Sequence, residues 1–186
     1  MSRITPAPAA QYAPVFGADA PLRLRVYAQA PEMAEAFVEF GQRMRDAAKL
    51  PPRLIELVRL RIAFHNQCRT CMAVRYEYGI EDGLTEDLVC SLERPEEAED
   101  LTDAERAALA FADKLATNHH AVEDADFQRL REHFSEAEAM ELCFFAASYV
   151  GFGRMAMVLD MVEDLPEGLR ADGPIQPWNQ PELVRL

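Results

Sequence analysis

Two cysteines separated by two residues form the part of this sequence best suited to chemistry, Cys68-Arg69-Thr70-Cys71. A two-residue gap lets both sulfur atoms meet at the first turn of a helix, where one thiolate attacks and the other closes an intramolecular disulfide. The thiolate is the reactive species, so the surroundings must lower a reference thiol pKa of about 8.5. The helix N-terminus and nearby guanidinium groups are candidate causes. The pair therefore predicts a redox-active dithiol.

Three neighbouring side chains are candidates for assisting the pair. Arg75 lies one helical turn beyond Cys71 on the same face, and a positive neighbour favours the charged form of a thiol. Glu56 lies in the preceding helix, and its carboxylate returns to the pair if the two helices pack antiparallel. His65 lies three residues before Cys68, and imidazole moves protons near neutral pH.

Other interpretations of these residues stay open at this stage. The same cysteine spacing serves zinc, but a structural zinc site normally takes four ligands and His65 supplies only a third. Two buried, inert thiols are the second alternative. Glu56 also has the spacing to pair with Arg53 or Arg59 at the surface. We predict neither a metal nor another cofactor. The remaining cysteines, which lie on apolar faces and are expected to behave as small hydrophobes, are Cys90 and Cys143.

The elements that must position these side chains are predicted to be helices. The chain has 29 alanines against 16 valines plus isoleucines, which favours helix over strand. Two capping boxes, Thr102 with Glu105 and Ser135 with Glu138, mark helix starts, and Thr85 is placed to cap a further one. Apolar periodicity and these caps predict helices over 33–44, from 51 onward, and over 71–78, 85–92, 102–115, 127–134, 135–147 and 155–162. The fold class is therefore all-α, a helical bundle.

Proline and glycine divide the chain. Most of the 12 prolines lie near the two ends, and proline breaks helix interiors. We therefore expect a non-helical Pro-rich arm over 1–31, a helical domain over 32–165 and a non-helical Pro-rich tail over 166–186, with Trp178 as a surface anchor. Gly151 and Gly153 are expected to interrupt the last long helix, and the methionines that follow them are expected to lie in the core.

Composition limits the environment and the partners. The chain has 186 residues and a formal net charge of −13, so its surface repels nucleic-acid backbones and anionic membranes. No apolar run is expected to reach the ~20 residues that span a bilayer. The opening segment MSRITPAPAAQYAPVF lacks the apolar core of a secretory signal. Together with the cysteine usage, this predicts a reducing, cytoplasmic location.

The segment around the cysteines resembles the carboxymuconolactone decarboxylase family, on its alkylhydroperoxidase D side. The resemblance rests on Glu56 followed a dozen residues later by Cys68 and Cys71, on LTDAERAALAFADKLA and on DADFQRLREHFSEAEAMEL. It extends over roughly 32–162 and implies an all-α fold and a homo-oligomer, often a trimer or hexamer. Leu57, Leu60 and Phe64, left over on the helix that carries Glu56, are expected either at such an interface or against other helices.

The resemblance also implies a function and residue roles. The redox branch of the family reduces organic hydroperoxides and is re-reduced by a dithiol, here a lipoamide- or thioredoxin-like partner. It makes Cys71 the controlled thiolate, Cys68 its disulfide partner and Glu56 the relay carboxylate. This sequence has Thr70 immediately before the second cysteine and Arg75 four residues after it, where the family's redox members carry histidines.

Arginine holds its proton at all physiological pH values, so Arg75 is expected to stabilise a thiolate by charge and not to act as its base. His65 is expected to take over proton transfer. The leading hypothesis is therefore a dithiol peroxidase of small organic hydroperoxides. The alternative is a redox-sensing or assembly protein of the same fold with little turnover.

Overall fold

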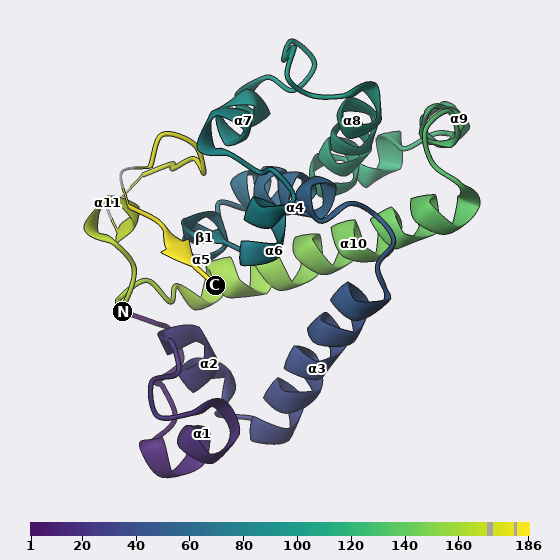
Figure 1. The fold of residues 1–186 in the computed structure, drawn as a ribbon. Coiled ribbons are helices and arrows are strands. Elements are labelled where there is room, and N and C mark those ends of the chain that lie inside the picture. Colours follow the sequence, from purple (N-terminus) through teal and green to yellow (C-terminus); the bar gives the residue numbers. More distant parts are fainter. Residues whose placement is uncertain (171–172, 181) are drawn as a thin grey trace.

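The computed structural model describes residues 1–170, 173–180 and 182–186, and its helices confirm the predicted all-α class (Figure 1). The helices are α1 (Ala9–Phe16), α2 (Leu22–Tyr27), α3 (Pro31–Ala47), α4 (Pro52–Asn66), α5 (Arg69–Ala73), α6 (Glu77–Glu81), α7 (Glu86–Cys90), α8 (Asp103–Thr117), α9 (Asp124–Arg131), α10 (Glu136–Leu159) and α11 (Glu167–Arg170), with single 3₁₀ turns at Ser91–Glu93 and His119–Ala121. Within the described residues, β-structure is limited to β1 (Val74–Arg75) and β2 (Val184–Arg185), which pair in parallel.

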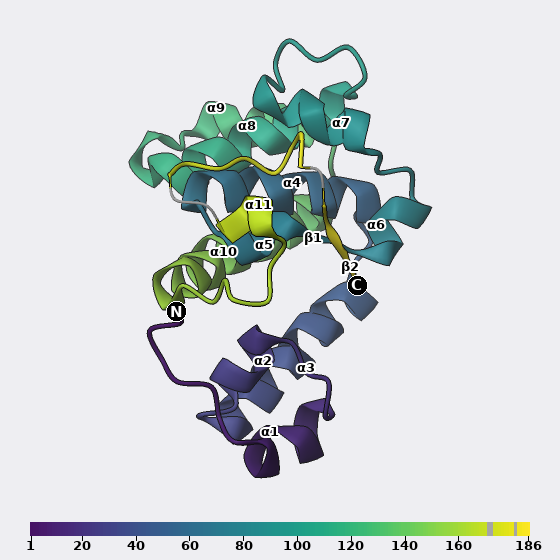
Figure 2. The same cartoon turned by 90° about the vertical axis from the view of Figure 1, so that its left-hand side faces the viewer.

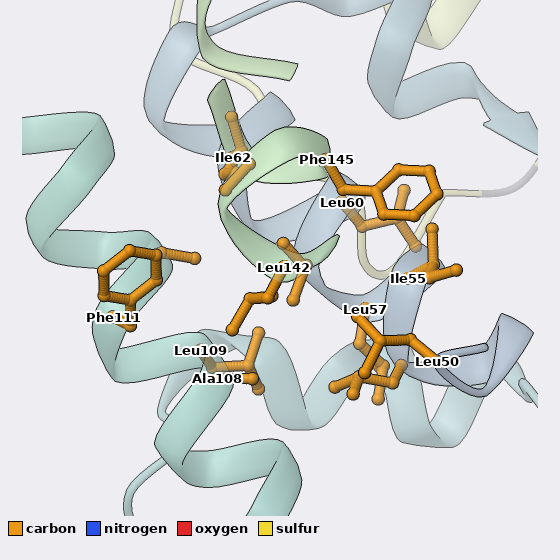
Figure 3. Packing of buried hydrophobic residues seen from close by; sticks show 14 of the residues in the cluster. Leu50, Ile55, Leu57, Leu60, Ile62, Ala108, Leu109, Phe111, Leu142 and Phe145 are labelled. Carbon is orange, nitrogen blue, oxygen red and sulfur yellow. The ribbon is translucent and has the colours of Figure 1, made fainter. Parts of the chain in front are cut away.

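Helix α4 lies at the centre of the bundle because it is apolar on nearly all sides. It packs between α10 and α8, as expected for a helix whose hydrophobic residues do not form a single stripe. Leu57 and Leu60 are fully buried in the core of this same chain, and Phe64 packs against it, so other helices of the chain cover them (Figure 3). The core thus holds rigid the helix that precedes the cysteine pair.

Helix α10 is continuous, so the break expected at Gly151 and Gly153 is wrong. Both glycines have helical neighbours on each side, and Gly153 has a packing role. A Cβ at Gly153 would lie 2.5 Å from Nδ2 of Asn66, whose amide donates to the Tyr149 carbonyl across the helix pair. The glycine therefore allows the close approach of α4 and α10. The predicted capping boxes at the starts of α8 and α10 are both confirmed.

The apolar length of α10 exceeds the expectation from the sequence. Among the described residues it is the one helix long and apolar enough, by length and composition, to cross a membrane, with a mean hydropathy of 1.6 over 18 residues. Its three glutamates lie near its start and only Arg154 interrupts the rest, so the expectation that no apolar run reaches this length is wrong. In this fold α10 is a bundle helix packed on α4, with one face uncovered. The exposed apolar side chains on that helix are Met140, Phe144, Phe152, Met155, Met157 and Val158, so the expected burial of Met155 and Met157 is wrong.

The two ends of the chain are more ordered than the proline content indicated. Residues 1–31 form α1 and α2, which lie with α3 on the opposite side of α10 from α4 and α8 (Figures 1 and 2). Proline is tolerated here because Pro8 and Pro21 precede helix starts and Pro14 lies within a short helix. At the other end, Trp178 is buried against Phe64 and is a core residue, not a surface anchor.

The helix expected over 71–78 is divided in the structure. Helix α5 ends at Ala73, β1 follows, and α6 begins at Glu77. The β-branched Val74 takes an extended conformation, and its carbonyl accepts a hydrogen bond from Arg59 at 2.7 Å instead of continuing the helix. This short extended segment gives β2 of the C-terminal tail a strand to pair with.

Candidate active site

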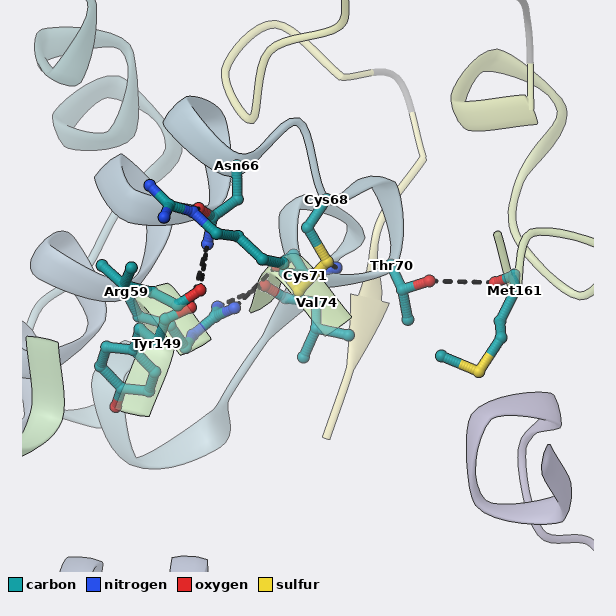
Figure 4. Close-up of a disulfide and its surroundings, with 10 residues drawn as sticks. Arg59, Asn66, Cys68, Thr70, Cys71, Val74, Tyr149 and Met161 are labelled. Atoms are coloured by element: carbon teal, nitrogen blue, oxygen red, sulfur yellow. Dashed lines mark hydrogen bonds between the residues drawn. A yellow bond between two sulfur atoms is a disulfide. The ribbon is translucent and has the colours of Figure 1, made fainter. Parts of the chain in front are cut away.

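The two cysteines are joined in a disulfide at the start of α5 (Figure 4). Their Cα atoms are 5.2 Å apart, and Cys68 is the N-cap of the helix, accepting from the backbone N–H of Cys71 on its sulfur at 3.3 Å. Gln67 ends α4 in the left-handed region with φ 51°, which turns the chain so that α5 can begin at once. The predicted geometry of a dithiol at a helix N-terminus is therefore present.

The two sulfur-bearing residues differ in their exposure. Cys68 is fully buried, in a small cluster with Leu22, Val26 and Met161, whereas Cys71 is partly exposed. Cys71 also lines a cavity of about 300 Å³ that Cys68 does not line. An incoming molecule therefore meets Cys71 first, and Cys68 is placed to react from behind it.

The cavity beside Cys71 is walled by aromatic rings and lies between α3, α4 and α10. Phe37 and Phe152 meet across it with ring centroids 4.4 Å apart, and Tyr76 and Tyr78 stack at 5.3 Å. The other aromatic residues of the wall are Tyr27, Phe40, Phe145 and Tyr149. The lining side chains come from five separate stretches of the sequence, so no local signal predicts this pocket. Such a mostly apolar hollow next to a reactive sulfur is a typical small-molecule site.

A buried ion pair supports the cysteine segment from α4. Glu56 is fully buried and accepts two hydrogen bonds of 2.8 Å from Arg59 and a third of 3.0 Å from the Tyr78 hydroxyl. Arg59 also donates to the carbonyls of Cys71 and Val74, each at 2.7 Å (Figure 4). The pairing of Glu56 with Arg59 was among the sequence alternatives, but it is an interior pair and not a surface one. The Glu56 carboxylate is thus connected to the Cys71 carbonyl through the Arg59 guanidinium.

Burial and charge set the protonation of this network. Although burial lowers the pKa of Arg59, the Glu56 carboxylate outweighs it and holds that pKa above its ordinary value. Burial first, and then the Glu56 charge, raise the pKa of Tyr78, and the same two causes raise that of Tyr149. Arg59 therefore stays charged and both tyrosines stay protonated near neutral pH. Gly79 makes room for the network, since a Cβ there would lie 2.5 Å from Cγ of Glu56.

His65 points away from the cysteines, which corrects its predicted place beside them. Its Nε2 lies 2.6 Å from Oδ1 of Asp113 on α8, and Arg61 binds the same carboxylate through two hydrogen bonds. The reason is the turn between them: Cys68 follows His65 by three positions, but α4 ends at Asn66 and the chain turns at Gln67, so helical spacing does not carry across. His65 does not line the cavity that Cys71 lines. The structure also does not bring it together with the cysteines as a third metal ligand.

Arg75 is likewise occupied elsewhere, so its expected contact with the Cys71 thiolate is wrong. Its side chain is buried and bonds Glu86 through Nε and Nη2, and Nη2 also donates to the Pro177 carbonyl at 2.6 Å. The helix that would have carried it one turn beyond Cys71 ends at Ala73. Arg75 therefore ties α7 and the C-terminal tail to β1. The positive charge on the cavity wall next to Cys71 comes from Arg59 instead.

Arg59 was visible in the sequence only as a possible partner of Glu56, three residues away on α4. Its contact with the Cys71 carbonyl depends on how α4 and α5 meet, and local spacing does not specify that. Tyr78 and Tyr149 had no signal, because nothing in a sequence marks which tyrosines face a cavity. Within residues 1–170, 173–180 and 182–186, no group of three or more His, Cys, Asp or Glu side chains gathers in a way that holds a metal ion.

These features define the class of protein: an all-α domain with a CxxC disulfide at a helix start, facing an apolar pocket. Residues 31–114 match the model of the carboxymuconolactone decarboxylase family. The match covers 84 of the 186 residues, less than half of the chain, so the similarity to that family holds for this segment.

Curated relatives match about half of this chain. Two uncharacterized proteins from strains of Mycobacterium tuberculosis are 38% identical over 96 residues, which are 51% of this chain and 34% of theirs. The chain thus spans about a third of the length of the curated relatives it matches. Neither relative's name states an activity.

Solved structures share the fold over most of the chain. A protein of unknown function from Agrobacterium tumefaciens, described as a putative antioxidant defence protein AhpD, is 25% identical with a TM-score of 0.64, covering 75% of this chain and 95% of that one. An uncharacterized peroxidase-related protein from Ralstonia eutropha with an alkylhydroperoxidase AhpD core is 22% identical, with a TM-score of 0.66 and coverage of 91% and 92%. The debrominase Bmp8 is 20% identical with a TM-score of 0.73 and coverage of 91% and 95%, and at such identity the likeness concerns the fold alone.

Proposed function

We propose that this protein is a dithiol peroxidase that reduces small organic hydroperoxides through Cys71 and Cys68. The observation that carries the proposal is the placement of the pair. Cys71 lines an apolar cavity of about 300 Å³, while its disulfide partner Cys68 is fully buried behind it. A peroxidase of this type needs one accessible nucleophile and one protected resolving thiol. The family and the AhpD-like fold are consistent with this role.

The reaction balances without a cofactor. The Cys71 thiolate attacks the outer oxygen of the hydroperoxide, the O–O bond breaks, and an alkoxide leaves and takes up a proton to give the alcohol. That proton comes from solvent in the cavity, because burial and the Glu56 charge raise the pKa values of Tyr78 and Tyr149 and keep both hydroxyls protonated. Cys71 is now a sulfenic acid. The Cys68 thiol condenses with it, releasing water and forming the disulfide present in this structure.

An external dithiol completes the cycle by thiol–disulfide exchange, becoming a disulfide itself while Cys68 and Cys71 return to thiols. A lipoamide- or thioredoxin-like reductant has the required chemistry. The reducing cytoplasm is the location in which such a partner keeps the pair reduced. No nucleic acid or membrane takes part in this scheme.

Arg59 and Glu56 support the nucleophile in this proposal. Arg59 lines the cavity with Cys71 and holds the Cys71 carbonyl, so its charge favours the thiolate. Because a guanidinium does not pass protons at physiological pH, Glu56 acts through Arg59 as a positioning residue. Its carboxylate keeps Arg59 extended toward α5.

Thiol mapping after peroxide treatment tests the proposal. Fully reduced protein receives one equivalent of tert-butyl hydroperoxide, and mass spectrometry locates the oxidised thiols. We expect a disulfide between Cys68 and Cys71 within seconds. The Cys68→Ser variant should accumulate a trappable sulfenic acid on Cys71, and Cys71→Ser should consume no peroxide. Thiols that stay reduced for minutes, or turnover that survives Cys71→Ser, would contradict the proposal.

A redox-sensing or assembly role is the second candidate, and the contacts of α5 favour it. Thr70 donates to the Met161 carbonyl at 2.9 Å (Figure 4). Arg69 donates to the carbonyls of Arg170 and Gly173. The disulfide segment thus holds the chain that follows α10. The uncovered apolar side chains of α3 and α10, among them Met33 and Phe144, support a homo-oligomer such as a trimer or hexamer. Coincident size-exclusion profiles for oxidised and reduced protein would remove this candidate.

A further inference from the structure

The cavity beside Cys71 carries positive charge although the protein as a whole is strongly acidic. Its lining includes Arg23, Arg45 and Arg59 and contains no aspartate or glutamate, in a chain with a net charge of −13. Arg59 forms an ion pair with Glu56. The ion pairs formed within the described residues leave Arg23 and Arg45 without a carboxylate partner. Two uncompensated cations on the wall of an apolar hollow favour an anionic ligand.

Arg23 belongs to a segment that the family match does not include. It lies on α2, whereas the matched residues begin at 31. Helix α2 is nevertheless fixed relative to the disulfide: the Leu22 backbone N–H donates to Asp164 at 2.7 Å, and Leu22 and Val26 pack in the cluster that contains Cys68. The cation therefore has a defined position near the reactive pair.

The rest of the wall suits a flat, apolar body. The Tyr27 and Phe37 rings meet edge to face at 5.9 Å, and Phe37 meets Phe152 at 4.4 Å. Aromatic faces in this arrangement receive another ring in stacked or edge-on contact. The field of the guanidinium groups extends to this wall: burial raises the pKa of Tyr76, but Arg23 and Arg59 outweigh burial and hold that pKa below its ordinary value.

From this juxtaposition we infer that the substrate is an aromatic hydroperoxide carrying one carboxylate, and that Arg23 is the residue that selects the carboxylate. The aromatic wall takes the ring, Arg23 pairs with the acid group, and the peroxide is presented to Cys71. The inference rests on the proposed peroxidase function for the reaction, but not for the binding of the acid.

Three hydroperoxides with matched chemistry test the selection. 4-Carboxycumene hydroperoxide has both the ring and the carboxylate, cumene hydroperoxide lacks the carboxylate, and tert-butyl hydroperoxide lacks both. We expect the second-order rate of Cys71 oxidation to be about tenfold higher with the carboxylated probe than with cumene hydroperoxide, as a charge-assisted hydrogen bond would give. In Arg23→Gln this ratio should fall to about one. Equal rates with the two aromatic probes in the wild type would overturn the inference.

Control variants distinguish the effect of where the positive charge lies from the effect of the protein's total charge. Arg43→Gln removes the same charge from the exposed outer face of α3, where Arg43 pairs with Glu39, and should leave the ratio as in the wild type. Arg23→Lys keeps the charge and should retain part of the preference, which Arg23→Gln loses. A ratio that falls in Arg45→Gln and not in Arg23→Gln would overturn the assignment to Arg23.

Equilibrium binding distinguishes failure of the ligand class from failure of the peroxidase. 4-Isopropylbenzoate, which has no peroxide bond, is titrated calorimetrically against 4-isopropylbenzyl alcohol as its neutral counterpart. We expect the acid to bind about tenfold more tightly and Arg23→Gln to abolish the difference. Binding of the acid without any peroxide reduction would sustain the ligand class while removing the peroxidase. Peroxide reduction by a protein that binds the two probes equally, or binds neither, would sustain the peroxidase and remove the ligand class.

Discussion

Helix α4 presents two ion-pair networks on different sides, and only one of them reaches the cysteine pair. On one side, Glu56 and Arg59 are buried, and Arg59 holds the backbone carbonyls of Cys71 and Val74. On another, Arg61 and His65 share the partly exposed carboxylate of Asp113 on α8. The first network belongs to the candidate site, and the second joins two helices of the bundle.

The comparison shows that chemical type and sequence distance do not identify the assisting group. His65 has the chemistry of a proton carrier and is close to Cys68 in sequence, yet it pairs with α8. Arg59 lies further away in sequence and contacts the cysteine segment directly. Changes in the buried network should therefore strongly affect the free energy of unfolding and the reactivity of Cys71. Changes in the partly exposed network should affect both quantities less.

The largest expected difference is in stability. Arg59→Met leaves the Glu56 carboxylate buried without its charged partner, which should lower the free energy of unfolding by about 3–5 kcal/mol. Arg61→Met should cost about 1.5 kcal/mol, because Asp113 keeps His65 and contact with solvent. Urea unfolding of the two variants measures the difference. The double variant Glu56→Leu with Arg59→Met should recover most of the lost stability. Equal losses in the two single variants would contradict the expected difference between the two networks.

The next effect concerns the reactivity of Cys71. If Glu56 acts through Arg59, Glu56→Gln leaves the guanidinium charge uncompensated and shifts alkylation of reduced Cys71 toward lower pH, by roughly half a pH unit. Asp113→Asn is the matched change in the other network and should not move the profile. The measurement is the rate of iodoacetamide alkylation of Cys71 against pH. A shift of Glu56→Gln toward higher pH would instead assign Glu56 to proton removal from the thiol.

The smallest effect is the pH dependence of the second network. Burial raises the pKa of Asp113, but hydrogen bonds from His65 and Arg61 outweigh it and hold that pKa below its ordinary value. The stability that Asp113 contributes is therefore fully present above its unfolded pKa of about 3.9 and is lost as pH falls through its folded pKa. Asp113→Asn should be less stable than the wild type at neutral pH, with the difference shrinking below about pH 4. Thermal unfolding across this range checks it, and a difference that grows on acidification would contradict the sign.

Local signals in the sequence predicted local structure well. The caps at Thr85, Thr102 and Ser135 all accept the expected backbone N–H, because capping depends on residues only three positions apart. The cysteine spacing likewise placed the disulfide correctly at a helix start. The proline content led to a wrong prediction for the N-terminal end. Proline disfavours the interior of a helix, and helices as short as α1 and α2 have little interior.

The errors within the site have a single cause. Arg75 and His65 were placed by counting along helices that the structure ends at Ala73 and Asn66. The end of α5 follows from contacts made by distant segments, namely the Arg59 bond to the Val74 carbonyl and the pairing of β1 with β2. Helix α4 ends where Gln67 takes the left-handed conformation. The aromatic cavity and its arginines depend on how α2, α3 and α10 come together, which no single window of sequence contains.

The parallel pairing of β1 with β2 has a consequence for the order of events during synthesis. Val74 pairs with Val184, so the strand directly after the cysteines emerges about 110 residues before its partner. At translation rates of roughly 5–20 residues per second, the cysteine segment waits on the order of 10 s for its covering tail. During that interval the nascent dithiol is open to oxidants and reductants from the side that the tail later covers.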